Sequence, residues 1–295
     1  MMTDYLKEFE QYLLENKGVS SNTLESYIRD VVQYINYAET QHSKDITKAD
    51  TALVNAYVKH LADKNRSHST CTRVIASIRC YYKFLNFYGY TKTNPAISVK
   101  LVREEKKLPK VLTAEEIDLL LAQPDPSDSK GCRDKAMLEL LYATGIRVSE
   151  LIDLNIGDVN TEVEVVFCRS GKATRCLPIY SNAARAVEDY INRVRSSVTT
   201  EEEQALFTNL NGTRLTRQGF WKIIKQYTKQ AGINSDITPH TLRHSLATQM
   251  LSKGAQLKDI QAILGHADIS STQVYAQIMR EQYASIYKKF HPRAK

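Results

Sequence analysis

Four polar residues near the end of the chain are of the types needed to break a phosphodiester bond without a metal. They are His240, Arg243, His266 and Tyr275. An arginine holds phosphate oxygens in a planar fork of N–H donors and stays charged at any relevant pH. A histidine gives or takes a proton near pH 7, and a tyrosine hydroxyl becomes a nucleophile when a neighbour accepts its proton. This set is therefore a candidate site for attack on a nucleic-acid backbone.

Short helices are predicted to bring these four residues together. Pro239 suits the first position of a helix, because its missing N–H costs little there, and the apolar residues that follow it recur in steps of three and four. A second helix is predicted over 256–264, ended by Gly265 as its C-cap. A polar cap residue then opens a third helix, which carries Tyr275.

A zinc site is the competing interpretation of the histidines. His240 and His244 lie one helical turn apart, and His266 could be a third ligand. However, Thr241 stands where a zinc protease motif has glutamate, and no CxxC pair occurs in the sequence. A structural role for His244 and an ordinary half-buried position for Tyr275, one of 17 tyrosines, also remain open.

Three boxes of the sequence resemble those of the tyrosine recombinases, most closely the Xer branch. They are ATGIRVSEL at 143–151, HTLRH at 240–244 and LGHADISSTQVY at 264–275. The tail FHPRAK at 290–295 also resembles the end of Xer proteins, and the resemblance extends over nearly the whole chain.

The resemblance implies a role for each candidate residue. Tyr275 is the nucleophile, which forms a 3′-phosphotyrosyl bond with duplex DNA. Arg147 and Arg243 hold the nonbridging oxygens of the scissile phosphate. His240 acts as acid and base toward the tyrosine proton, and His266 donates to the phosphate or positions it.

A β-hairpin is predicted between 162 and 180, where apolar residues alternate with a period of two around a glycine-containing turn. In the family, a lysine on this hairpin is the general acid that protonates the departing 5′ oxygen. An ungapped alignment puts Ser170 at the usual position of that lysine. The role therefore falls to Lys172, two positions further on, if the turn tolerates the offset. A solvated turn lysine is the alternative.

The first 100 residues are predicted to form a four-helix domain. Apolar residues repeat at helical spacing in two helices over 3–39, and again over 48–62 and 69–88. The resemblance identifies these helices with a SAM-like DNA-binding domain that embraces the core site. Arg66 and Arg73 lie near a helix start and are predicted to belong to a phosphate-contacting region. A solvated helix end is the alternative.

The charge-rich segment 101–112 is predicted to be an exposed linker, and 113–295 a catalytic domain. The expected fold class is mainly α, with a small antiparallel sheet in the catalytic domain. Arg147 follows a glycine turn there, and its alternative role is a surface salt bridge to Glu150. In relatives, a helix like the one predicted over 279–290 docks into the neighbouring subunit. A tail helix packed on its own domain is the competing view.

Between the hairpin and Pro239, three further elements are expected. Ser181 is predicted to cap a helix that reaches about 197, and 205–208 to form a short strand. A helix after residue 216 contains Trp221, which is predicted to lie in the core or to pack against another helix. Arg214 and Arg217 near its start are candidate phosphate contacts, and a solvated pair is the alternative.

Composition points to a polyanionic partner and a reducing compartment. Forty Lys+Arg against 33 Asp+Glu leave a net charge of +7. Five cysteines form no disulfide pattern, although Cys168 and Cys176 are expected to lie opposite each other in the hairpin. The polar N-terminus lacks a signal-peptide core, and no apolar run is long enough for a membrane span. A cytoplasmic, nucleoid-associated protein is expected.

The resemblance implies a Xer-like site-specific recombinase that resolves chromosome or plasmid dimers through a Holliday junction. Its partners would be a duplex DNA core site and three further recombinase protomers, identical or of a second kind, and it would need no cofactor or metal. A mobile-element integrase is the nearest alternative, although the chain has no segment for an additional arm-site module. A type IB-like topoisomerase and a DNA-binding regulator without catalysis are more distant ones.

Overall fold

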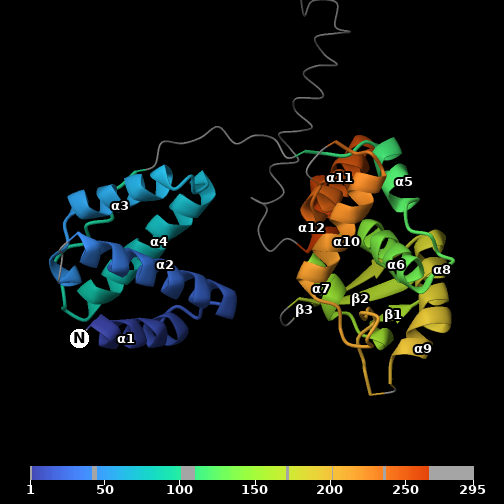
Figure 1. Ribbon diagram of the computed structural model, residues 1–295, viewed down its shortest axis with the longest axis horizontal. Helices are drawn as coiled ribbons and strands as arrows, with labels where there is room; N and C mark the ends of the chain where they lie inside the picture. Colours follow the sequence, from blue (N-terminus) through green and yellow to red (C-terminus); the bar gives the residue numbers. More distant parts are fainter. Residues whose placement is uncertain are drawn as a thin grey trace, which may run out of the picture. The chain divides into compact units, whose positions relative to one another are not determined.

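The computed structural model describes residues 2–41, 45–100, 110–170, 173–200, 202–234 and 237–265. The chain forms two compact units, Met1–Lys106 and Lys107–Lys295 (Figure 1). Lys172, His266 and Tyr275 lie outside the described residues, as does the segment predicted to form the C-terminal helix.

The first unit is helical, as predicted. Its elements are α1 (Met2–Glu15), α2 (Ser21–Thr40), the 3-10 turn η1 (Ile46–Lys48), α3 (Thr51–Asp63) and α4 (His68–Phe87). Ser20, Asp50 and Ser67 cap helices by accepting a backbone N–H three residues on. The core is rich in aromatic residues, and the buried hydroxyls of Tyr34 and Tyr82 are hydrogen-bonded at 3.0 Å.

The second unit is mainly α with one small sheet, which confirms the predicted fold class. It begins with α5 (Ala114–Leu121), α6 (Ser129–Thr144), α7 (Val148–Asp153) and η2 (Ile156–Asp158). The strands follow, and then α8 (Ser181–Tyr190), the short π-helix η3 (Ile191–Arg195) and α9 (Ser196–Val198). The last elements are α10 (Arg217–Gln230), α11 (Pro239–Ser252) and α12 (Leu257–Leu264).

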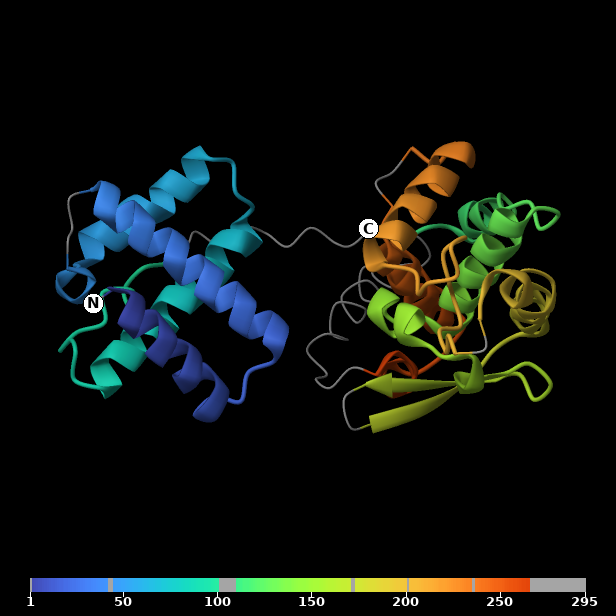
Figure 2. The same cartoon turned by 60° about the horizontal axis from the view of Figure 1, so that its bottom comes forward.

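The sheet has the order β1 (Val159–Asn160), β2 (Val165–Ser170), β3 (Ala173–Pro178), and every pairing is antiparallel. In Figure 2 the β2–β3 hairpin lies along the lower edge of this unit. The predicted opposition of Cys168 and Cys176 is wrong by one residue. The ladder closes on Ser170 and Ala173, so Cys168 faces Arg175 and is buried, whereas Cys176 is exposed.

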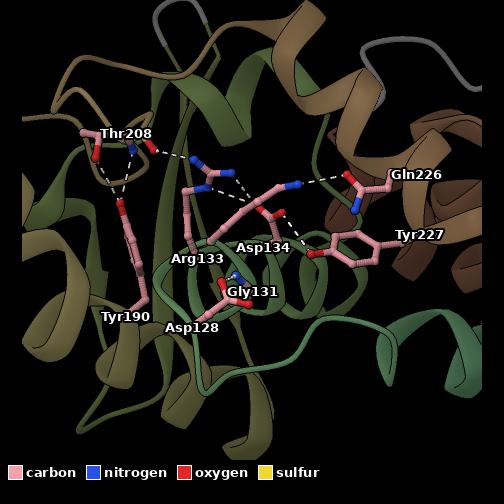
Figure 3. Close-up of polar contacts among 9 residues, drawn as sticks. Asp128, Gly131, Arg133, Asp134, Tyr190, Thr208, Gln226 and Tyr227 are labelled. Atoms are coloured by element: carbon pink, nitrogen blue, oxygen red, sulfur yellow. Dashed lines mark hydrogen bonds and ion pairs between the residues drawn. The ribbon is translucent and has the colours of Figure 1, made fainter. Parts of the chain in front are cut away.

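A buried polar network ties the central helix α6 to its neighbours (Figure 3). Asp134 accepts two hydrogen bonds from Arg133, at 2.9 and 2.7 Å, and one from the hydroxyl of Tyr227 on α10, at 3.1 Å. Arg133 also donates to the carbonyl of Thr208, which ties in the segment before α10. Because Asp134 is fully buried, its charge depends on these partners.

Several local predictions need correction. The expected strand 205–208 makes only isolated bridges, from Ala205 to residue 155 and from Thr208 to residue 214. The helix after the hairpin is capped by Tyr180, and not by Ser181, without a side-chain bond. Leu112, expected in an exposed linker, is buried, and its N–H donates to a serine of α11.

Trp221 is the clearest error, because it is 44% exposed and not part of the core. The buried face of α10 is formed by Phe220, Ile223, Ile224 and Tyr227. These four residues follow the spacing of one helix face, and Trp221 lies to the side of it.

In the described residues, no helix is long and apolar enough to cross a bilayer.

Candidate active site

Arg147 lies at a sharp turn between two helices. Helix α6 ends at Gly145, whose φ of +59° is left-handed. A Cβ at Gly145 would come within 2.8 Å of side-chain atoms of Leu246 and Leu264, so the turn is also closely packed. Arg147 then caps α7, and its backbone N–H donates to Glu150 at 2.7 Å.

The side chain of Arg147 is held at two points. Its Nη1 donates to Oε1 of Glu150 at 3.3 Å, and its Nη2 donates to the carbonyl of Gly265 at 3.4 Å. The predicted alternative, an ion pair with Glu150, is therefore present, but Glu150 is buried and the side chain of Arg147 is 37% exposed. The carboxylate orients the arginine while part of the guanidinium stays accessible.

Glu150 is shared between two arginines. Its Oε1 also accepts from Nη1 of Arg175 on β3, at 3.2 Å. Burial raises the pKa of Glu150, but the backbone N–H of Arg147 and the two guanidiniums outweigh burial and lower the pKa below its ordinary value. The carboxylate is therefore ionised at neutral pH.

Arg243 is fixed more firmly than Arg147. It lies on α11 with 4% exposure, and its guanidinium donates to the carbonyls of Gly145 and Leu264. Both carbonyls belong to helix ends, where backbone acceptors lack partners within the helix. The start of α11 at Pro239 and the end of α12 at Gly265 were both predicted, and they set this arrangement.

His240 lies on the first turn of α11, beside the two arginines. Desolvation, followed by the positive charges of Arg243 and Arg147, lowers its pKa below the ordinary 6.5. At neutral pH the imidazole is therefore uncharged and able to accept a proton. Desolvation, with His240 and Arg243, likewise lowers the pKa of His244, one turn further along.

One open pocket of about 340 Å³ connects these groups. Arg147, His240 and Arg243 line it, together with Arg217 and Trp221 from the start of α10. Lys225 lies 4.5 Å above the indole ring, which adds another positive charge at this face of α10. The pocket thus combines positive charge, a neutral imidazole and an exposed aromatic ring.

The other predicted DNA contacts are in different settings. Arg214 donates to the carbonyls of Ile152 and Leu154 at the end of α7, so its guanidinium is engaged within the domain. Arg73 is paired with the buried Asp30 on α2. Arg66 lines a separate pocket of about 590 Å³ in the first unit.

The sequence interpretation missed Trp221 as a pocket residue and Arg175 altogether. A signal for Arg175 existed, because period-two alternation puts it on the same strand face as the buried Leu177. A charged residue at an inward-facing strand position calls for a partner. Among the described residues, no group of three or more histidine, cysteine or acidic side chains could hold a metal. His266, the third ligand of the zinc interpretation, lies outside them.

Comparisons with known proteins agree with the fold. The sequence model described as "Phage integrase family" matches residues 110–282, and "Phage integrase, N-terminal SAM-like domain" matches 6–87. The protein called tyrosine recombinase XerD of Oceanobacillus iheyensis is 42% identical, over 99% of this chain and 100% of that protein. The protein of the same name from Staphylococcus epidermidis strain RP62A is 40% identical, with the same coverage.

Solved structures share the architecture. XerA recombinase has 27% identity and a TM-score of 0.55, over 98% of this chain and 99% of that one. XerH bound to a palindromic difH substrate, in a post-cleavage complex, has 16% identity and a TM-score of 0.76, over 96% and 94%. The latter likeness concerns the fold alone.

The chain belongs to the phage integrase family. Its similarity to the XerD proteins confirms the tyrosine recombinase family, and the Xer branch within it, predicted from the three sequence boxes.

Proposed function

We propose that this protein is a Xer-like site-specific recombinase that resolves DNA dimers, with Tyr275 as its nucleophile. The observation that carries the proposal is the convergence of Arg147, His240 and Arg243 on one pocket, although they come from distant parts of the sequence. Two guanidiniums beside a neutral imidazole suit a phosphodiester that must be held while a proton is removed from its attacker.

The arginines bind the scissile phosphate. Arg243 is preset by two backbone carbonyls, and Arg147 by Glu150 and Gly265. A guanidinium has five N–H donors, and the two side-chain hydrogen bonds of Arg147, to Glu150 and to Gly265, leave donors for a nonbridging oxygen. The attraction between the two arginines and the phosphate increases as negative charge accumulates in the transition state. The arginines therefore accelerate the reaction as well as bind DNA.

Strand cleavage exchanges one ester for another. The Tyr275 hydroxyl gives its proton to His240, and its oxygen forms a bond to phosphorus. The bond from phosphorus to the 5′ oxygen breaks, and the ammonium of Lys172 gives that oxygen a proton. His266 donates to the phosphate during this step. The products are a 3′-phosphotyrosyl bond and a free 5′ hydroxyl.

Rejoining reverses these steps with a different strand. The 5′ hydroxyl of a partner duplex attacks the phosphotyrosine, and Tyr275 leaves as a phenol. Because each phosphodiester is replaced by another, no ATP is consumed. Each protomer cuts one strand, so two duplexes require four protomers in a closed ring. The segment 279–290 docks into the neighbouring subunit, and the other protomers are identical or of a second kind.

Further DNA contacts come from Arg217, which lines the pocket, and from the region of Arg66 and Arg73 in the first unit. Arg214 is left out of this proposal, because the carbonyls at the end of α7 engage its guanidinium. The net charge of +7 supports a polyanionic partner, and the five free thiols fit a reducing compartment. The protein therefore acts in the cytoplasm, on the nucleoid.

A nicked duplex tests the proposal. Duplexes that bind the protein are first selected from a random pool, and the recovered site is nicked near its centre so that a short fragment diffuses away after cleavage. We expect a covalent protein–DNA product on a denaturing gel. Tyr275→Phe should bind the site equally well and give no product, whereas Tyr88→Phe, which changes an exposed tyrosine of the first unit, should react normally.

The rivals are distinguished with the same selected site, carried either by the nicked duplex or by a supercoiled plasmid. A topoisomerase would relax supercoils without exchanging strands between two sites. A DNA-binding regulator would bind the selected duplex without forming a covalent product. Covalent product from Tyr275→Phe would exclude this residue as the nucleophile.

A further inference from the structure

Arg175 is a charged side chain on the inward face of β3. It is 13% exposed, and its Nη1 donates to Glu150 at 3.2 Å. Its Nε and Nη2 are also buried, and neither has a hydrogen-bond partner within the described part of the chain. Burying a guanidinium with so few partners lowers the stability of the fold. A purely structural role does not account for such an arrangement.

The Arg175 guanidinium lies directly behind the active site. A Cβ placed on Gly265 would be 2.0 Å from Nη1 of Arg175 and 2.4 Å from its Cζ, so the guanidinium packs on the Gly265 backbone. The carbonyl of the same glycine accepts from Nη2 of Arg147. Arg175 and Arg147 thus share two neighbours, Gly265 and Glu150.

The shared carboxylate determines how much charge reaches the phosphate. One oxygen of Glu150, Oε1, contacts both guanidiniums at nearly equal distances, 3.3 Å to Arg147 and 3.2 Å to Arg175. Without Arg175, Arg147 and Glu150 would form a neutral pair in a partly desolvated site. With Arg175 present, the three groups carry a net charge of +1, and the more exposed guanidinium, that of Arg147, faces the pocket.

We propose that Arg175 is a positioning residue for DNA cleavage: it offsets the charge of Glu150, so that the carboxylate holds Arg147 in place without neutralising it. This inference rests on the proposed recombinase function. It predicts an effect on the chemical step, because the charge of Arg147 matters most when negative charge builds on the phosphate.

Single-turnover cleavage of the nicked duplex at saturating protein tests this role. Arg175→Gln should slow formation of the covalent product by at least about 10-fold, and leave the Kd for DNA within about 2-fold. Arg175→Lys keeps the charge and should remain within about 3-fold of the unmodified protein. Arg169→Gln on the adjacent strand β2 is the matched control. It removes an arginine paired with Asp158 at 2.7 Å but 68% exposed, and should cleave normally.

The second substitution separates charge balance from structural support. If Arg175 offsets Glu150, removing the carboxylate charge must partly restore cleavage. The double variant Glu150→Gln/Arg175→Gln should therefore cleave faster than Arg175→Gln alone. A merely structural arginine gives the opposite result, with the two losses multiplying.

Several outcomes overturn the inference. Unchanged cleavage by Arg175→Gln, or multiplied losses in the double variant, assigns Arg175 no part in charge balance. If Arg175→Gln does not fold, Arg175→Lys and the double variant decide, and slow cleavage or loss of folding in both overturns it. If the unmodified protein forms no covalent product with any selected duplex, the proposed function itself fails, and the role of Arg175 falls with it.

Discussion

Gly145→Ala should damage both the stability of the catalytic unit and its active site. An alanine at φ +59° costs about 1–2 kcal/mol relative to glycine. The new Cβ would also lie 2.8 Å from Cδ2 of Leu246 and Cδ2 of Leu264. Overpacking of this kind typically costs about 1–3 kcal/mol. We therefore expect a loss of about 2–5 kcal/mol in the free energy of unfolding.

Gly232→Ala provides the matched control in the same unit. Its φ is +67°, but in the described part of the chain no atom beyond its two chain neighbours lies within 4 Å of a Cβ there, so only the backbone strain applies. We expect this variant to lose about 1–2 kcal/mol. The difference between the two variants measures the packing around Gly145.

Urea unfolding followed by tryptophan fluorescence is a suitable assay. Trp221 is the only tryptophan in the chain and lies in the catalytic unit, so the signal reports that unit. Cleavage should respond too, because the Gly145 carbonyl holds Arg243. A displaced guanidinium should slow cleavage by about 10- to 100-fold. Equal stability losses for the two glycine variants, with normal cleavage by Gly145→Ala, would refute this reasoning.

Three further predictions concern single groups. Lys172→Ala should slow cleavage by about 10²–10⁴-fold. A duplex with sulfur in place of the scissile 5′ oxygen should escape this defect, because a thiolate leaves without a proton. An equal defect on both duplexes would exclude Lys172 as the acid. Cleavage should be present above the lowered pKa of His240 and be lost as the pH falls through that pKa. A profile of the cleavage rate from about pH 5 to 8 should therefore have its acid limb below 6.5. If the midpoint of that limb lies at or above 6.5, the desolvated imidazole is not the base. Asp134→Ala leaves the buried guanidinium of Arg133 uncompensated and should lower the free energy of unfolding in urea by about 3–5 kcal/mol. Tyr227→Phe removes one 3.1 Å hydrogen bond to Asp134 and should lower it by about 1 kcal/mol. Similar losses for the two variants would show that Asp134 is not the centre of the buried polar network of α6.

The helices that carry the described site residues were predictable, because local signals bracket them. Pro239 and a capping threonine begin α11, and Gly265 ends α12 in a left-handed conformation. These signals act within a few residues, so they can be read without knowledge of the fold. The convergence of Arg147 with Arg243 depends on tertiary packing, and only the family resemblance predicted it.

The errors arose where one residue decides the outcome. The hairpin register depends on the length of its turn, and the observed pairing of Ser170 with Ala173 places Cys168 opposite Arg175 and not opposite Cys176. On α10, the choice between Phe220 and Trp221 as the inward residue determines which ring is exposed. Both positions fit a helix, and the remaining inward residues favour Phe220.

Arg214, a predicted phosphate contact, has competing acceptors within its own unit. Its position near a helix start suggested an anion, but the carbonyls at the C-terminus of α7 lie within reach of its guanidinium. Helix C-termini attract cations through their unpaired acceptors. The sequence does not reveal which of two acceptors an arginine will meet, because the competing helix end comes from a segment about 60 residues away.

The two units build their cores from separate sets of residues, the first from aromatic side chains of α1–α4 and the second around α6. Exchanging the first unit between relatives should transplant a preference for flanking DNA while the cutting machinery stays intact. A family built in this way can change the DNA sequence that it binds without changing its cleavage chemistry.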